Sequence, residues 1–135
     1  IVGDGPLRIE LEKMRKRLHL QNHITFHGHQ NNVNYFYEKA DIFVLSSIYE
    51  GFGNVLVEAL NYGLKIISTD CPNGPSEILN NSKYGLLIPS NDKYALKEAI
   101  KKIRKLEFDK KLLQKRASDF HIEVISKLYL DQMCL

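Results

Sequence analysis

The 135-residue sequence has little cysteine, no tryptophan and no long hydrophobic run. Its two cysteines, Cys71 and Cys134, stand far apart without a CxxC pair, which argues against a disulfide framework or a cysteine zinc site. Apolar runs such as residues 42–45 and 85–88 are far too short to span a bilayer. These features favour a protein of the reducing cytoplasm.

What the sequence does contain fits one globular domain with a real core. It is 44% hydrophobic and 26% charged, with a formal net charge of +3. A mildly basic chain suits an acidic ligand. Its basic residues are concentrated between residues 101 and 116, where a solvated helix face is the simpler interpretation and contact with an anionic membrane surface the alternative.

Strand and helix signals alternate along the chain. Helices are predicted over residues 6–20, from 31 or 32 to 40, over 54–62, over 75–79 and from 92, and strands over 24–27, 42–45, 65–69 and 86–88. The helix over 6–20 has one apolar face that we expect to be buried. Residues 42–45 are apolar without alternation, as in a parallel strand covered on both faces, and residues 109–134 form the C-terminal helices.

This alternation predicts the α/β class, with a doubly wound, Rossmann-like parallel sheet. In such sheets ligands bind beyond the carboxyl ends of the strands. No linker or repeat separates a second domain within residues 1–135.

Residues 49–60, YEGFGNVLVEAL, place two carboxylates around a glycine-aromatic-glycine turn. Glu50 follows the apolar strand, and Glu58 lies one turn into the next helix, on the same face as Asn54. The first amides of that helix carry partial positive charge and suit a phosphate or diphosphate. The glutamates accept hydrogen bonds, so they suit the hydroxyls of a ribose and of a hexose attached to that diphosphate.

These motifs resemble the C-terminal donor-binding domain of the retaining GT-B glycosyltransferases of family 4. The hallmark of that family is two glutamates separated by seven residues, which Glu50 and Glu58 match. Three more stretches match in order: residues 1–6 (IVGDGP), 40–47 (ADIFVLSS) and 68–79 (STDCPNGPSEIL). The resemblance spans most of residues 1–105, and four ordered motifs are far more specific than a single glycine turn.

The resemblance implies a role for each residue of the turn. Glu58 would bind the ribose hydroxyls, and Glu50, the implied catalytic residue, would orient the donor hexose. The implied donor is a UDP- or GDP-linked sugar, with no metal and no other cofactor. The implied donor site consists of Glu50, Gly51, Phe52, Gly53, Asn54, Val55, Leu56 and Glu58, and Gly28 and His29 are implied to lie near the nucleotide base.

The implied activity is transfer of a hexose, with retention, to a glycan or lipid-linked acceptor. Such enzymes serve the biosynthesis of cell-surface polysaccharide or lipopolysaccharide, in the cytoplasm or peripherally at the inner face of the membrane. The family also has an N-terminal acceptor domain, and in its C-terminal domain a first strand is followed by an arginine and a lysine. Residues 1–135 match neither of these features. We therefore expect a partial domain that is inactive alone; the alternative is a non-catalytic nucleotide-binding partner or regulatory module requiring a second chain.

Simpler interpretations stand beside these. Without the resemblance, residues 51–53 are an ordinary strand-helix turn and Glu58 is a solvated helix residue. Histidines at positions 19, 23, 27 and 29 raise the question of zinc, but predicted elements separate them and no thiolate or carboxylate joins them. Nucleic-acid binding is disfavoured, because aromatic residues such as Phe26 and Phe43 fall at core spacing.

The last expectation concerns the sheet. If residues 1–2 end a second strand, the unmatched first strand would be central in the order 3-2-1-4-5-6. The two sheet halves would then lie about 10 Å apart, twice the normal strand spacing, or pair in a way atypical of the family. A continuous five-stranded sheet in which residues 1–2 pair with 42–45 would contradict this.

Overall fold

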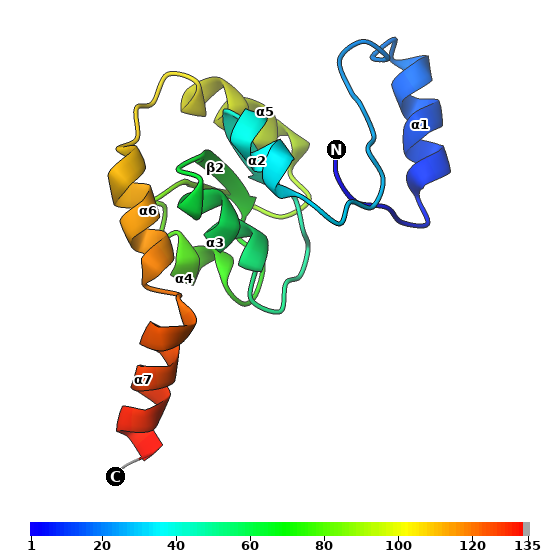
Figure 1. The fold of residues 1–135 in the computed structure, drawn as a ribbon. Coiled ribbons are helices and arrows are strands. Elements are labelled where there is room, and N and C mark those ends of the chain that lie inside the picture. Colours follow the sequence, from blue (N-terminus) through cyan, green and yellow to red (C-terminus); the bar gives the residue numbers. More distant parts are fainter. Residues whose placement is uncertain (134–135) are drawn as a thin grey trace. The chain divides into compact units, whose positions relative to one another are not determined.

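The computed structural model describes residues 1–133, so Cys134 lies outside the described residues. The chain divides into two compact units, Ile1–Phe36 and the remainder from Tyr37 onward, and each is described by itself (Figure 1). No helix in the described part is both long and apolar enough to cross a bilayer. The elements are α1 (Arg8–Arg17), α2 (Asn34–Lys39), β1 (Ile42–Leu45), α3 (Asn54–Asn61), β2 (Lys65–Thr69), α4 (Pro75–Ile78), β3 (Leu86–Ile88), α5 (Lys93–Ile103), α6 (Lys110–Ser118) and α7 (Ile122–Met133).

The first unit consists of α1 and an extended segment held to it by two arginines. The Arg8 guanidinium donates to the carbonyl of Phe26 at 3.3 Å, and Arg15 donates to the carbonyl of Ile24 at 2.9 Å. Both guanidinium groups also lie over the Phe26 ring, 5.0 and 5.5 Å from its centroid. Arg8 further pairs with Glu12 at 2.6 Å, and this hydrogen bond lowers the pKa of the Glu12 carboxyl.

Two predictions for this unit are wrong. The helix forms, but none of its residues is buried, because one helix beside one extended segment has little to cover its apolar face. Residues 24–27 form no strand; Gly28 makes isolated bridges with Val2 and Gly3, the first parallel and the second antiparallel. Because the sense of the pairing changes at Gly3, whose φ is +111°, the two bridges do not extend into a ladder.

The second unit contains a three-stranded parallel sheet in the order β1-β2-β3. Ile42 pairs with Lys65 at the start of β1, and Ile67 pairs with Leu86 at the start of β3. The strands predicted over 42–45, 65–69 and 86–88 are confirmed, as is their order, because each consists of a short apolar run that a helix separates from the next.

Both faces of β2 are covered, as the doubly wound prediction requires. Ile67 packs with Ala99 and Ile103 of α5 in one buried cluster. Because successive side chains of a strand point to opposite faces, Ile66 and Ser68 face the other way, and both are fully buried. The second face is therefore covered as well, and α3 packs against β2.

β1 differs from its prediction because it lies at an edge of this sheet. Within the described part of the chain it pairs with β2 alone, and Val44 is 40% exposed. The expectation that residues 42–45 are covered on both faces is thus wrong: an edge strand lacks the neighbours that cover a central one. Residues 1–2 and 42–45 form no continuous five-stranded sheet, and the 10 Å separation stays a prediction.

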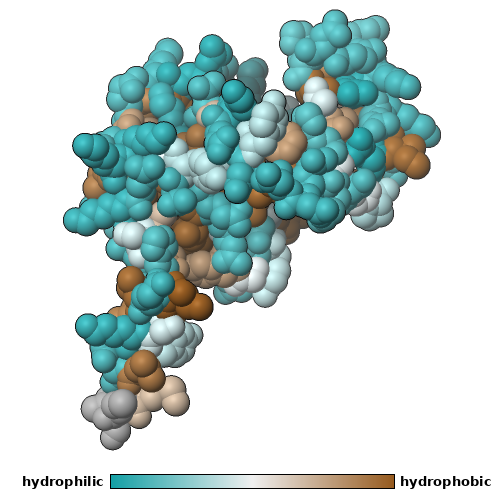
Figure 2. All heavy atoms as spheres, in the orientation of Figure 1, coloured by the Kyte–Doolittle hydropathy of each residue, from teal (hydrophilic) through white to brown (hydrophobic). Residues whose placement is uncertain are grey.

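The predicted C-terminal helical region divides into α6 and α7. α6 begins after Asp109, whose carboxylate accepts from the Lys111 amide, and it buries Leu113 and Ala117 against the domain. α7 has no buried residue. Apolar side chains of α7 and Phe52 line a groove of about 620 Å³, and Figure 2 shows hydrophobic atoms gathered where α6 gives way to α7.

Candidate functional site

The loop after β1 carries the predicted turn into α3. Glu50 is half-buried in this loop, and Gly51 and Phe52 are exposed. Gly53 precedes the helix with φ 94° and ψ 46°, a left-handed conformation that a residue with a side chain adopts only at a cost. The sequence therefore places glycine at the position where the chain must turn sharply from strand to helix.

The start of α3 offers free amide donors. The Leu56 amide donates to the carbonyl of Gly53 at 2.8 Å, but those of Gly53, Asn54 and Val55 have no partner in the described part of the chain. No side chain caps this helix, and its first turn carries no acidic residue. Free amides and the partial positive charge of a helix start are the donors that a phosphate group prefers.

The loop after β2 supports this turn. A Cβ placed on Gly74, which has φ +106°, would lie 1.6 Å from the carbonyl oxygen of Phe52, so the two backbones are in close contact. The Thr69 hydroxyl donates to the carbonyl of Ser47, and the Asn73 amide donates to the Tyr49 hydroxyl at 3.3 Å. The ends of β1 and β2 are thereby joined at one edge of the sheet.

Glu58 lies in the second turn of α3, exposed but not free. The Tyr37 hydroxyl donates to its Oε2 at 2.8 Å. Tyr37 is only 8% exposed, and its ring stacks on Tyr62 with centroids 5.3 Å apart and planes at 18°. The pKa of the Tyr37 phenol is raised well above its usual range, first because the phenol is buried, and then because of this hydrogen bond and the negative charge of Glu58. The phenol therefore keeps its proton and stays a donor.

Glu50 differs from Glu58 because no described residue donates a hydrogen bond to its carboxylate. Both of its oxygens are therefore available to hydroxyl donors. Residues 50–56 and Glu58 belong to one continuous strand-turn-helix segment, in which free amides lie between two carboxylates. This arrangement can bind an anionic group and hydroxyls attached to it, and the individual roles assigned to these residues stay predictions.

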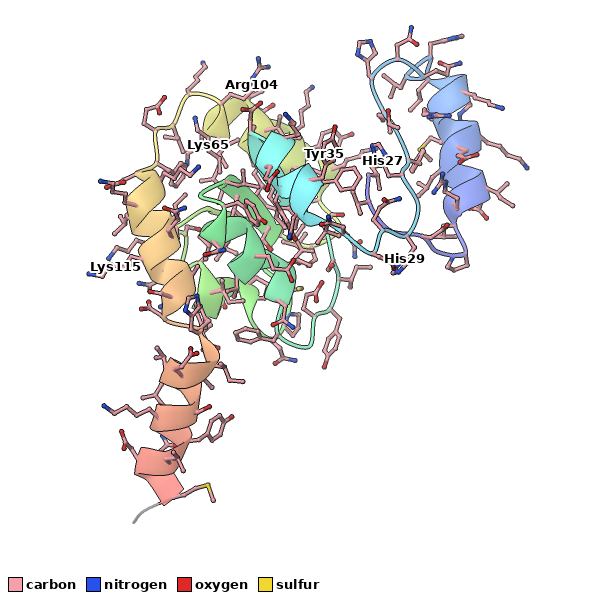
Figure 3. The ribbon with its side chains drawn as sticks, viewed as in Figure 1. His27, His29, Tyr35, Lys65, Arg104 and Lys115 are labelled. Atoms are coloured by element: carbon pink, nitrogen blue, oxygen red, sulfur yellow. The ribbon has the colours of Figure 1, made fainter. Side chains whose placement is uncertain are left out.

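The two residues predicted beside the nucleotide base lie in the first unit. Gly28 has φ +69° and takes part in the bridge with Val2, and His29 is exposed. His27 and His29 lie on the extended segment of this unit (Figure 3). Their role at a base stays a prediction.

Sequence reasoning missed Tyr37 and Gly74. The sequence pattern does not single out Tyr37; the available signal was that a buried tyrosine hydroxyl usually needs a hydrogen-bond partner. Gly74 falls within the quoted stretch 68–79 but received no role, because its contact with Phe52 connects loops far apart in sequence. Among residues 1–133, no group of three or more histidine, cysteine, aspartate or glutamate side chains is arranged to hold a metal ion.

A parallel sheet whose strands alternate with helices, with open backbone amides where β1 leads into α3, is the architecture of the doubly wound α/β class. Comparison with known proteins then identifies the family. The model of glycosyl transferases group 1 matches residues 1–119, and the chain belongs to this family.

Individual relatives agree with this assignment. The chain is 35% identical, over 96% of its length, to GalNAc-alpha-(1->4)-GalNAc-alpha-(1->3)-diNAcBac-PP-undecaprenol alpha-1,4-N-acetyl-D-galactosaminyltransferase of Campylobacter jejuni. Its structure is similar to that of the lipopolysaccharide outer core galactosyltransferase WaaB in its apo form, with a TM-score of 0.88, 19% identity and 98% of this chain covered. It is also similar to Anabaena Alr3699/HepE in complex with UDP, with a TM-score of 0.82, 21% identity and 98% of this chain covered.

These structural similarities confirm the predicted fold class, that of GT-B glycosyltransferases. The chain spans 37% of the Campylobacter relative and 39% of each of the two solved chains.

Proposed function

We propose that this chain is the donor-binding part of a glycosyltransferase that uses a nucleotide-diphosphate sugar, UDP- or GDP-linked, and transfers the hexose with retention. The observation that carries the proposal is the row of free amides at the start of α3, flanked by Glu50 and Glu58, in a chain of the group 1 family. The HepE structure in complex with UDP supports a nucleotide ligand for this fold.

In this proposal each part of the segment has one task. The amides of Gly53, Asn54 and Val55 stabilise the diphosphate, including the negative charge that develops on it as the sugar leaves. Glu58 accepts hydrogen bonds from the ribose hydroxyls. Glu50 accepts from the hexose hydroxyls and orients the sugar. The acceptor hydroxyl oxygen then bonds to the anomeric carbon on the face from which the diphosphate departs, the bond from that carbon to the diphosphate oxygen breaks, and the departing diphosphate takes the hydroxyl proton. No protein nucleophile is required.

The acceptor is a glycan or a lipid-linked glycan, and the pathway is cell-surface polysaccharide or lipopolysaccharide biosynthesis. The Campylobacter relative, whose name specifies an undecaprenol-linked substrate, supports this choice. We place the enzyme in the cytoplasm, peripheral to the inner face of the membrane. Turnover requires an acceptor-binding domain and the basic pair of the family in addition to residues 1–135, so these residues bind donor but do not turn it over by themselves.

The test measures binding of UDP, GDP and ADP by titration calorimetry, followed by donor turnover, in the full-length protein. Glu58→Gln should weaken binding of the preferred nucleotide by about 5- to 150-fold, the loss of roughly 1 to 3 kcal/mol for hydrogen bonds to a charged group. Glu107→Gln is the matched control, because Glu107 is exposed in the loop between α5 and α6, outside the segment.

The outcomes separate the alternatives. Absence of nucleotide binding, or equal affinity in the wild type and Glu58→Gln, contradicts the proposed site. Nucleotide binding without turnover in the presence of lipid-linked acceptors favours the non-catalytic partner module.

A further inference from the structure

Tyr37 and Glu58 form a hydrogen-bonded pair between different elements of the second unit. Tyr37 belongs to α2 and Glu58 to α3, 21 residues later, and the phenol oxygen lies 2.8 Å from Oε2 of the carboxylate. This bond connects a buried ring to an exposed acid. An exposed glutamate would otherwise sample several rotamers, because its side chain has three rotatable bonds.

The Tyr37 ring is itself held in place. It stacks on Tyr62, the residue directly after α3, and lies 5.8 Å from the Phe43 ring of β1. The donor therefore has one position, fixed by the helix that carries Glu58 and by the neighbouring strand. A hydrogen bond from a fixed donor also fixes the acceptor.

We propose that Tyr37 is a positioning residue that holds the Glu58 carboxylate in one orientation, so that it recognises two adjacent hydroxyls together rather than a single hydroxyl. This inference rests on the proposed function, in which Glu58 binds the ribose. The Tyr37 hydroxyl occupies one acceptor site on Oε2, and both acceptor sites on Oε1 and one on Oε2 stay available.

Selectivity for a ribose over a 2′-deoxyribose follows from this geometry. A fixed carboxylate meets two hydroxyls at once, and a nucleotide that lacks the 2′-hydroxyl leaves one acceptor unmatched. A carboxylate that rotates freely can reorient toward the remaining hydroxyl and recover part of the loss. Tyr37 thereby contributes to selectivity without contacting the ligand.

The experiment compares the affinities of UDP, GDP and ADP with those of their 2′-deoxy forms, using titration calorimetry on the full-length protein. The wild type should prefer the ribose form of its preferred nucleotide by about ten- to a hundredfold, the scale of one charge-assisted hydrogen bond. Tyr37→Phe should reduce this preference by about three- to tenfold, because it removes the donor and keeps the ring. The ratio of the two affinities cancels any loss in the fraction of folded protein.

Two further variants make the result specific. Tyr84→Phe is the control, since Tyr84 is a half-buried tyrosine whose hydroxyl has no hydrogen-bond partner among the described residues. Its ratio should equal that of the wild type. Glu58→Gln should bring the ratio close to one, and adding Tyr37→Phe to it should change nothing more, because the two residues act as one unit.

The outcomes distinguish this inference from the proposed function. If Tyr37→Phe keeps the wild-type ratio while Glu58→Gln loses it, Tyr37 is structural only and the donor-site proposal stands. If Glu58→Gln keeps the ratio, the ribose role of Glu58 is wrong, and the inference fails with it. A wild-type protein that binds none of the nucleotides overturns both.

Discussion

Substitution of Gly74 by alanine tests whether the loop after β2 supports the turn before α3. Two costs add. An L-residue at φ +106° costs of order 1–3 kcal/mol in backbone strain. The new Cβ would also lie 1.6 Å from the Phe52 carbonyl oxygen, and overpacking of this kind typically costs about 1–3 kcal/mol more.

The sum, roughly 2–6 kcal/mol, is a large part of the 5–15 kcal/mol by which a domain of ordinary stability resists unfolding. At a slope of about 2 kcal/mol per molar urea, the unfolding midpoint should fall by about 1–3 M. Nucleotide affinity should fall too, because relief of the overlap displaces Phe52 and, with it, the first amides of α3.

Gly51→Ala is the control for the unfolding measurement. A Cβ at Gly51 meets nothing within 4 Å, so its stability should stay within about 0.5 kcal/mol of the wild type. If the two variants unfold at the same urea concentration, the contact between Gly74 and Phe52 does not constrain the turn, and the reasoning is refuted.

Three further predictions concern individual side chains. Because folding raises the pKa of the Tyr37 phenol, its contribution to stability is complete below the ordinary tyrosine pKa of about 10 and is lost as the pH rises further. The unfolding free energy, measured with urea, should therefore fall less between pH 9 and 11 in Tyr37→Phe than in the wild type. An equal fall in both proteins contradicts this prediction. Arg116→Met removes hydrogen bonds to the carbonyls of two α4 residues, at 2.7 and 3.0 Å, and should lower the unfolding free energy by about 1.5–3 kcal/mol. The same substitution at the exposed Lys115 should leave the unfolding free energy unaltered (Figure 3). Equal effects of the two substitutions would show that the Arg116 hydrogen bonds are not stabilising. In steady-state kinetics of the full-length enzyme, Glu50→Ala should lower kcat more than it raises KM, and Glu58→Ala should do the reverse; wild-type values for both would refute the two roles.

The central strands could be predicted from the sequence because their signal is local. The apolar stretches 42–45, 65–69 and 86–88 lie between helical segments, and their parallel order follows from that alternation. Burial could not be predicted in the same way, because it depends on what covers an element. The apolar positions of α1 indicate a helix correctly, yet none of them is buried, and the pattern at 42–45 does not reveal that β1 is an edge strand in the described part.

In the candidate site, too, local features could be predicted from the sequence and long-range contacts could not. The turn at Gly53 and the helix start after it are properties of neighbouring residues, so the glycine pattern and the spacing of Glu50 and Glu58 indicate them directly. The contacts of Gly74 and Tyr37 join segments about 20 residues apart, and no local pattern specifies which partner a buried hydroxyl or a close backbone approach will find.

The different surroundings of the two glutamates bear on their roles. Glu58 has lost much of its rotational freedom to Tyr37 before any ligand arrives, so a ligand that it binds bears little of that entropic cost. Glu50 has no donor from a described residue. In the proposed function the sugar itself therefore orders this carboxylate, and its hydrogen bonds can strengthen as the sugar changes shape and charge during reaction. A preorganised acid suits ground-state binding, and an acid ordered by its substrate suits transition-state stabilisation. If both acids were equally free, the kinetic separation of Glu50 from Glu58 would have no structural basis; the Tyr37 hydrogen bond supplies one.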